Sequence, residues 1–462
     1  MRRPHQPLWI ALAATAAVFL TAGPISLMAW AQGPTPNDKR HARPHSSPSL
    51  DTPTATPSPS SSSAAPTPTP ATSPSSAAPA GAAPFAFGTL VTRLEHATEE
   101  SSRGVTVAMM ELSWANYEPA AGQFNAAYAQ QMRARLATLR AAGMRVTLGL
   151  GIHFTPGWIF EYPDSRYVNQ RGQVANELNV VFNQAIRSRV DGYLRQVNRD
   201  LGFGNFWAVR LTSGGDPEVL YPGGGSYWAF DANAQNGAQL PPSMARNPLP
   251  GWRPGQQSVS LTQVRAWADW YVHGLDDVVA WQMRLISSLG FGGYYQLLTP
   301  GSGTRPDGYA RAIANYLPDG VTGVGAVWQT FYASLPDKHG VVAYVSSMAD
   351  GSGGDDSCTL GDAAIPVSDS QADRWSAARW IARLAHEYGL PASGENPGWN
   401  MPSSLNTKYV DGSSSGMMAV SVRQMTSCRF QGMYWAHDEN LWNGRVPFDR
   451  YADWVATTNG GA

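Results

Sequence analysis

Two glutamates follow separate apolar runs and could act together as a catalytic pair. Glu218 closes the segment RLTSGGDPE, and Glu395 lies in the segment PASGENPGW. A pair of facing carboxyl groups can cleave a glycosidic bond, because one protonates the leaving oxygen while the other attacks the anomeric carbon or activates a water molecule. Either glutamate alone could instead be a solvated or capping group, so the hypothesis requires that both lie at one site.

Polar and aromatic residues that could bind a sugar follow the same runs and others like them. An aromatic face can stack on the C–H face of a pyranose ring, while carboxylate, amide and imidazole groups can bind its hydroxyls. We expect substrate contacts from Glu111, Trp114, His153, Trp158, Asp216, Asn396, Trp399, Trp435 and His437. Among the tryptophans, Trp435 is the strongest candidate.

Several of these residues also have a structural interpretation. Glu111 could be a buried ion-pair partner that holds the mouth of the fold together. His153 could satisfy a backbone carbonyl, and His437 with Asp438 could cap a loop. The segment 221–257, rich in Pro, Gly and Asn, directly follows Glu218 and could either wall the cleft or only cover its rim.

Eight short apolar runs alternate with helical stretches and must position these residues. The expected strands are 85–91, 105–113, 145–152, 206–212, 293–298, 341–347, 390–393 and 430–435. Helical periodicity is clearest at 126–142, 183–200, 261–289 and 371–388. This alternation is typical of repeated βα units around a parallel sheet.

Repeated βα units of this number predict an α/β fold of the (β/α)8 TIM-barrel type over residues 85–462. In such a barrel the chemistry lies where the strands end, which is where Glu218 and Glu395 are expected. A doubly wound open sheet is the alternative. It is disfavoured because no Gly-x-Gly-x-x-Gly motif opens a helix after an early strand.

The segment 110–124 resembles the second-strand region of family 42 glycoside hydrolases, the β-galactosidases of the large retaining (β/α)8 clan. The resemblance rests on Glu111, Trp114, Glu118-Pro119 and the motif GQF that ends at Phe124. It continues in the motifs GMRVTLG and TPGW, the second of which ends at Trp158. It is specific over about 85–218 and general afterwards, where the strand order and the glutamate of the seventh strand carry it.

The resemblance implies an acid/base glutamate after the fourth strand and a nucleophile after the seventh, which are Glu218 and Glu395. Retention requires carboxyls about 5 to 5.5 Å apart, whereas about 6.5 to 9.5 Å would indicate inversion. In the clan the acid/base commonly follows an asparagine that binds the sugar's 2-hydroxyl, but Pro217 precedes Glu218 here, and Asp216 could supply that hydrogen bond. The family resemblance alone implies a β-galactoside first, with other plant or microbial β-glycans next.

Composition and charge exclude several other classes. A formal net charge of -1 gives no basis for a nucleic-acid footprint. The two cysteines, Cys358 and Cys428, could form one disulfide in an exported chain. His386-Glu387 lacks the second histidine of a zinc motif, and the chain lacks the cysteine cluster that binds zinc in many family 42 enzymes. We expect no metal and no cofactor.

The N-terminal residues have the pattern of an export signal. Arg2 and Arg3 precede an apolar run, and the small-residue pattern at 29–31 could mark cleavage, which predicts a signal peptide over 1–31. The same stretch could remain as a membrane anchor. Residues 32–84 consist mainly of Pro, Ser, Thr and Ala and predict a disordered linker. We therefore expect a secreted or cell-surface protein.

Two functional hypotheses remain. The first is a secreted retaining glycoside hydrolase that acts on an oligo- or polysaccharide through Glu218 and Glu395. The second is a carbohydrate-binding surface protein whose barrel has lost turnover, which the unusual residues before Glu218 and the linker suggest. An acyl hydrolase is disfavoured because no Gly-x-Ser-x-Gly motif is present.

Overall fold

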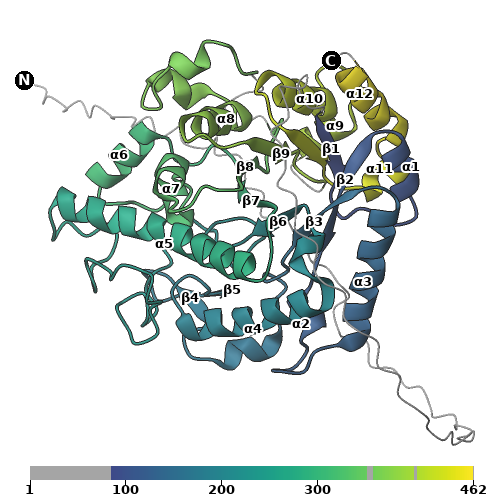
Figure 1. Ribbon diagram of the computed structural model, residues 1–462. Helices are drawn as coiled ribbons and strands as arrows, with labels where there is room; N and C mark the ends of the chain where they lie inside the picture. The colour runs from purple at the N-terminus through teal and green to yellow at the C-terminus, as the bar shows by residue number, and fades with distance from the viewer. Residues whose placement is uncertain (1–84, 351–356, 400–402, 461–462) are drawn as a thin grey trace, which may run out of the picture. The chain divides into compact units, whose positions relative to one another are not determined.

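Eight parallel strands close into a barrel, with β1 hydrogen-bonded to both β2 and β10 (Figure 1). The structure, a computed structural model, describes residues 85–350, 357–399 and 403–460. The predicted (β/α)8 barrel is confirmed, and the open doubly wound sheet is excluded. The expected signal segment at 1–31 and linker at 32–84 lie outside the described residues.

The barrel strands overlap the eight runs expected from the sequence. They are β1 (Ala86–Thr89), β2 (Val105–Glu111), β3 (Arg145–Gly149), β6 (Ala208–Leu211), β7 (Tyr294–Thr299), β8 (Val341–Val345), β9 (Ala392–Glu395) and β10 (Gly432–Trp435). Short strands of Val, Leu, Met and aromatic residues suit a parallel sheet that is covered on both faces. One difference bears on the site, because β9 extends to include Glu395.

Helices surround the barrel in Figure 1 and cover its outer face. They are α1 (Ala97–Ser102), α2 (Trp114–Tyr117), α3 (Ala126–Ala141), α4 (Gln184–Leu201), α5 (Leu261–Ser288), α6 (Pro306–Ala314), α7 (Trp328–Ser334), α8 (Ala377–Glu387), α9 (Ser403–Val410), α10 (Met417–Ser427), α11 (Glu439–Trp442) and α12 (Phe448–Gly460). No helix of the described segments combines the length and apolar character that a membrane crossing requires.

Side-chain caps explain where the long helices begin. Asn125 and Asn183 accept hydrogen bonds from the first turns of α3 and α4, and Ser260 forms a capping box with Gln263 at the start of α5. The helix expected at 371–388 is divided in two, because Ser376 is extended and caps α8 after a 3-10 turn at Ser370–Arg374. The capping side chain starts a new helix there.

A two-stranded antiparallel hairpin, β4 (Arg166–Val168) and β5 (Val174–Leu178), interrupts the connection between β3 and α4. This hairpin was not predicted from the sequence. Its strands are short and mix polar with apolar residues, so they resemble a loop in the sequence. The hairpin brings Glu177 against the loop that carries the candidate acid, since a Cβ at Gly215 would lie 3.0 Å from that of Glu177.

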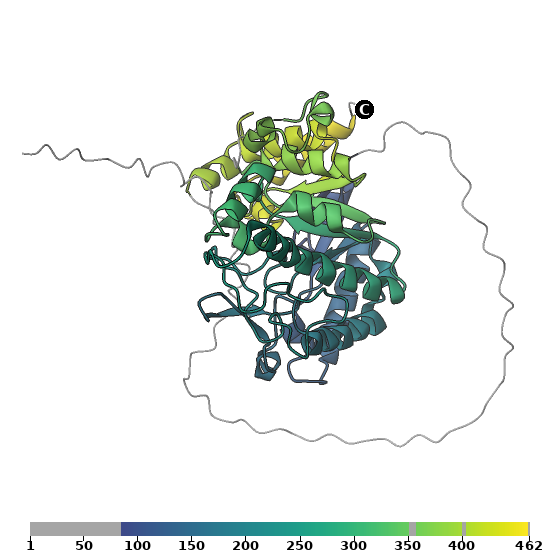
Figure 2. The same cartoon turned by 90° about the vertical axis from the view of Figure 1, so that its left-hand side faces the viewer.

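The segment between β6 and α5 contains no helix or strand, yet much of it is buried, and its loops lie beside the barrel in Figure 2. Tyr221 stacks on Tyr271 of α5 with ring centroids 4.1 Å apart, and Trp252 packs against Trp267 at 5.4 Å. The Trp270 indole donates to the Ala245 carbonyl at 2.8 Å. These contacts pack the segment against α5. The aromatic side chains of the segment and of the helix together form a part of the hydrophobic core.

The first and last described elements are tied together. The backbone N–H of Phe85 donates to the Asn459 side chain, which donates back to the Phe85 carbonyl, both at 3.0 Å. Tyr451 of α12 donates to the Gly88 carbonyl in β1 at 2.7 Å. The last helix therefore holds the strand that completes the barrel.

Candidate active site

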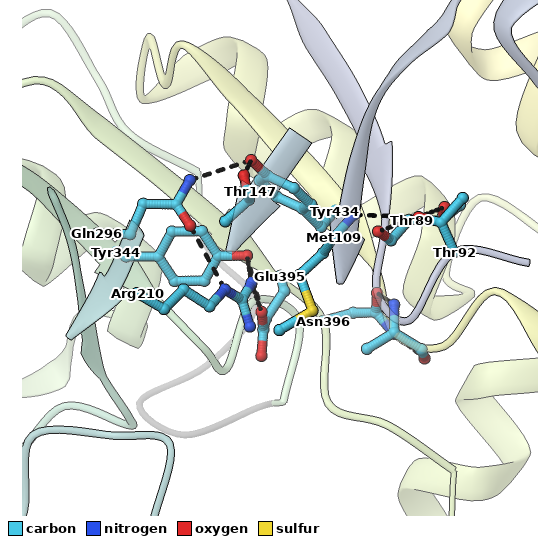
Figure 3. Close-up of polar contacts among 11 residues, drawn as sticks. Thr89, Thr92, Met109, Thr147, Arg210, Gln296, Tyr344, Glu395, Asn396 and Tyr434 are labelled. Atoms are coloured by element: carbon cyan, nitrogen blue, oxygen red, sulfur yellow. Dashed lines mark hydrogen bonds and ion pairs between the residues drawn. The ribbon is translucent and has the colours of Figure 1, made fainter. Parts of the chain in front are cut away.

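Glu395 is the last residue of β9 and is held by two donors from other strands (Figure 3). Its Oε2 lies 2.6 Å from Nη2 of Arg210 on β6 and accepts the Tyr344 hydroxyl of β8 at 2.7 Å. The side chains of Arg210 and Glu395 are only 3% and 2% exposed. The Arg210 guanidinium thus supplies the opposite charge that a buried carboxylate needs, in a charge-assisted hydrogen bond.

The second oxygen of Glu395 is available for chemistry. No described residue donates a hydrogen bond to Oε1, whereas Oε2 has both partners. A carboxylate fixed through one oxygen presents the other in a defined direction. Glu395 therefore has the environment that a nucleophile or general base requires.

Glu218 lies in the loop after β6 and is only 4% exposed. The Ser213 backbone N–H and hydroxyl both donate to the Glu218 carbonyl at 3.3 Å, and Val219 N–H donates to the Leu298 carbonyl at 3.2 Å. Burial, with the nearby charges of Asp216 and Glu395, raises the pKa of Glu218 to about 8. A carboxyl that stays protonated at neutral pH can serve as a general acid.

Glu111 adds a third carboxyl, which is half-buried, at the same end of the barrel. It ends β2, and its Oε1 accepts the Gly151 N–H at 2.9 Å. A Cβ at Gly149 of β3 would collide with this carboxyl, so only glycine leaves room for it. Burial raises the pKa of Glu111 to about 8, although Arg210 opposes the shift. Glu111 faces Arg210 and Glu395 but is hydrogen-bonded to neither in the structure.

Asp216 is half-buried and stands two residues before Glu218. Burial, followed by the charge of Glu177 on the β5 hairpin strand, raises its pKa to about 6. Neither the hairpin nor the proximity of Glu177 was expected from the sequence. The structure thus places Asp216 beside the candidate acid, and its role toward a sugar hydroxyl remains a proposal.

The structure corrects the expected role of Trp114. This side chain is fully buried, donates to Glu118 Oε2 at 2.8 Å and stacks on Tyr193 at 5.3 Å. The other oxygen of Glu118 accepts the Gly122 N–H at 2.7 Å. Trp114 and Glu118 therefore fold the loop after β2 and present no face to a sugar. Trp158, which donates to the Glu118 carbonyl at 2.9 Å, is half-buried and remains a candidate contact.

Trp435 and Asn396 are corrected in the same way. Trp435 is fully buried against Tyr409 of α9 and Tyr451 of α12, because it faces outward from β10 while Tyr434 faces the barrel interior. The Asn396 amide accepts the Ala436 N–H at 3.0 Å and donates to the Ala436 carbonyl at 3.3 Å. Asn396 therefore ties the ends of β9 and β10 together, and Trp435 packs the barrel against its outer helices, so both side chains have structural partners in place of the expected sugar.

The two candidate histidines are both neutral at ordinary pH. Burial lowers the pKa of His153 to about 4, and its two ring nitrogens have no hydrogen-bond partner among the described residues. Burial, with the charge of Arg210, also lowers the pKa of His437 to about 4. Trp399 is half-buried, with the Arg445 guanidinium 4.2 Å from its ring centroid. All three remain proposed substrate contacts.

Cys358 and Cys428 form a disulfide with their Cα atoms 4.9 Å apart. It joins the segment after β8 to the residue that follows α10. The same segment approaches the site, since Met348 N–H donates to the Glu395 carbonyl at 2.9 Å. In the part of the chain that is described, no cluster of three or more His, Cys, Asp or Glu side chains could hold a metal ion.

Several residues of the site could not be singled out from the sequence. Arg210, Tyr344, Gln296 and Tyr434 all point from strands into the barrel (Figure 3). One feature of the sequence could have identified Arg210. It is a charged residue inside the apolar strand AVRL, and a charged residue that is buried needs a partner.

Comparisons with known proteins match different parts of the chain. A family model matches one segment, and solved structures match most of the barrel. The family model described as beta-galactosidase, of glycoside hydrolase family 42, matches residues 95–198. This match includes Glu111 and ends before both Glu218 and Glu395. No curated protein matches the sequence.

Two solved structures illustrate the fold. The catalytic domain of a beta-amylase from Paenibacillus polymyxa is similar with a TM-score of 0.55 at 13% identity, over 81% of this chain and 98% of that one. A beta-galactosidase from the haloarchaeon Halorubrum lacusprofundi is similar with a TM-score of 0.50 at 12% identity, over 81% of this chain. The present chain spans only 57% of that beta-galactosidase.

The closed barrel, the family match and the resemblance of residues 110–124 agree with one another. The protein is a glycoside hydrolase-like (β/α)8 barrel that resembles the family 42 β-galactosidases.

Proposed function

We propose that this protein is a secreted retaining glycoside hydrolase that cleaves β-linked sugars, with a β-galactoside or a related β-glycan as substrate. The proposal rests on the different environments of two buried carboxyls, those of Glu395 and Glu218. Glu395 is paired with Arg210 and Tyr344, whereas Glu218 has no cationic partner within hydrogen-bonding distance among the described residues, and burial raises its pKa to about 8. Carboxyls in opposite protonation states are what glycosidic cleavage requires.

The reaction follows from these environments. Oε1 of Glu395 attacks the anomeric carbon while Glu218 gives its proton to the leaving oxygen, which breaks the glycosidic bond and forms a glycosyl ester on Glu395. Glu218, now a carboxylate, takes a proton from water, whose oxygen attacks the anomeric carbon and releases Glu395. Glu111, Asp216, His153, Trp158, Trp399 and His437 are the proposed sugar contacts.

Export is part of the proposal. The basic, apolar and small-residue pattern of residues 1–31 supports it, and so does the Cys358–Cys428 disulfide, since disulfides persist in oxidising compartments. Fractionation of expressing cells, with N-terminal sequencing of the mature chain, would test secretion against retention at the membrane.

A second candidate is an inverting, beta-amylase-like activity. It is favoured by the similarity of the barrel to nearly the full length of a beta-amylase catalytic domain. In that case Glu395 acts as general base on a water molecule instead of as nucleophile, and Glu218 keeps its role as acid. The two candidates differ in the configuration of the released sugar.

The test is turnover of a panel that contains aryl β-glycosides, β-linked polysaccharides and starch. The purified full-length protein is compared with Glu395→Ala, Glu218→Ala and the control Glu161→Gln, which changes an exposed glutamate. Release by wild type and control that collapses in both alanine variants supports the proposal, and ¹H NMR of the first product distinguishes retention from inversion. No release from any substrate, with binding retained in all variants, would instead indicate a carbohydrate-binding protein.

A further inference from the structure

A chain of hydrogen bonds continues from the active site into the barrel interior (Figure 3). Arg210 Nε donates to Gln296 Oε1 at 3.4 Å, and Gln296 Nε2 donates to the Tyr434 hydroxyl at 3.0 Å. The same hydroxyl shares a hydrogen bond of 2.9 Å with Thr147 Oγ1. The chain joins β3, β10, β7 and β6, and all four side chains are buried.

The direction of these bonds fixes the Gln296 amide. Because the guanidinium can only donate, the amide oxygen must face Arg210, which leaves Nε2 to donate to the Tyr434 hydroxyl. The guanidinium is also enclosed by rings, with its carbon 4.8 Å from the Tyr344 centroid and 5.6 Å from that of Tyr434. Neutral side chains thus orient Arg210 from the barrel interior, and its guanidinium forms the ion pair with Glu395.

We propose that Tyr434 is a positioning residue, which acts through Gln296 to hold Arg210 against Glu395. The inference rests on the proposed function, because it assigns to Tyr434 the orientation of the residue that stabilises the nucleophile. Tyr434 touches neither Glu395 nor the reacting atoms by any hydrogen bond in the described structure. Its effect on catalysis passes through two intervening side chains.

The loss of the Tyr434 hydroxyl would have a specific consequence. Gln296 Nε2 would lose its acceptor, so the amide oxygen that accepts from Arg210 Nε at 3.4 Å would be less firmly fixed. Arg210 would then be less favourably held beside Glu395. The other titratable groups that face Glu395 are Tyr344, Glu111 and Glu218, and they are unchanged by this substitution.

The kinetic test compares wild type with Tyr434→Phe and the control Tyr451→Phe. Tyr451 is equally buried, and its hydroxyl donates to a backbone carbonyl away from the site. We expect Tyr434→Phe to lower kcat about tenfold with KM within about twofold, because a misplaced group costs transition-state stabilisation. Tyr451→Phe should leave kcat and KM unchanged.

A second readout needs no turnover. With ¹⁵N-arginine labelling, the Arg210 side-chain signal is the one absent from Arg210→Lys, and it should shift in Tyr434→Phe and stay in place in Tyr451→Phe, because Arg210 Nε donates to Gln296. If Tyr434→Phe does not fold, Gln296→Leu breaks the same link. An unchanged Arg210 signal overturns the inference whatever the activity. Wild-type protein that hydrolyses nothing would instead refute the proposed function, while the Arg210 signal still decides the role of Tyr434.

Discussion

Arg210 and Glu395 form a buried ion pair across the barrel although 185 residues separate them in the chain, with Nη2 2.6 Å from Oε2. Breaking such a pair from one side leaves an uncompensated buried charge, which is strongly destabilising. The pair therefore links the stability of the barrel interior to the chemistry at its mouth. It also gives the two candidate carboxyls different environments, since Arg210 is hydrogen-bonded to Glu395 and, in the described structure, not to Glu218.

The pH dependence of activity should report Glu218. Because burial raises its pKa to about 8, Glu218 stays protonated at neutral pH and loses its proton above about pH 8. We expect kcat/KM to fall on the alkaline side near this value. Measured with an aryl glycoside whose leaving group needs no protonation, Glu218→Gln should lack this limb.

Glu111 is the control for this assignment, because burial raises its pKa to about 8 as well. If Glu218 is the acid, Glu111→Gln keeps the alkaline limb at the same pH even where its activity is lower. Loss of the limb in Glu111→Gln and its persistence in Glu218→Gln would exchange the two roles.

Gly149 should be intolerant of a side chain. A Cβ at this position would overlap the Glu111 carboxyl, so Gly149→Ala must displace this carboxyl from its hydrogen bond with the Gly151 N–H. Overpacking of this kind costs about 1 to 3 kcal/mol, and we expect that loss in the free energy of unfolding, measured with urea. The control is Gly192→Ala in α4, where the added methyl meets no atom within 4 Å and should stabilise the helix. Equal effects of the two substitutions would contradict this packing argument.

A second pair of buried acids should make stability depend on pH. Burial, with the nearby Asp438 carboxyl, raises the pKa of Glu100 far above its ordinary value. Glu100 is thus protonated in the folded protein and ionised in the unfolded chain at neutral pH. Its stabilising contribution is complete below the unfolded pKa and is lost as pH rises toward the folded pKa, between about pH 5 and pH 9.

Glu100→Gln should remove this dependence, because an amide can hydrogen-bond much as the protonated acid does. We expect unfolding free energies equal to wild type near pH 5 and higher by roughly 1 to 3 kcal/mol near pH 9. Glu99→Gln, on the exposed side of α1, is the matched control. Parallel pH profiles for wild type and Glu100→Gln would show that the pair does not titrate in this way.

The barrel could be predicted from the sequence, whereas the contacts inside it could not. Runs such as VVAYV of β8 and VTVAMME of β2 are apolar enough to indicate buried strands without a partner being known. The Arg210–Glu395 pair depends on the register of the closed sheet, which no single segment contains. Strand alternation also explains why Trp435 was misplaced, since its neighbour Tyr434 is the residue paired in register with Glu395.

The orientation of the residues expected at the rim of the barrel also could not be predicted from the sequence. Trp114 and Asn396 have side chains that suit a sugar, but each is used to fold its own loop, through Glu118 and Ala436. Residue type at a strand end indicates what chemistry is possible there. Whether the side chain faces the cleft depends on local hydrogen bonds that only the folded chain defines.

The most direct measurement is covalent labelling of the protein by a 2-deoxy-2-fluoro derivative of the best aryl glycoside substrate, read by mass spectrometry. We predict a mass increase of one glycosyl unit, carried by the peptide that contains Glu395 and absent from Glu395→Gln. An unlabelled wild-type protein that still hydrolyses the parent glycoside, or a label on another residue, would contradict Glu395 as the nucleophile.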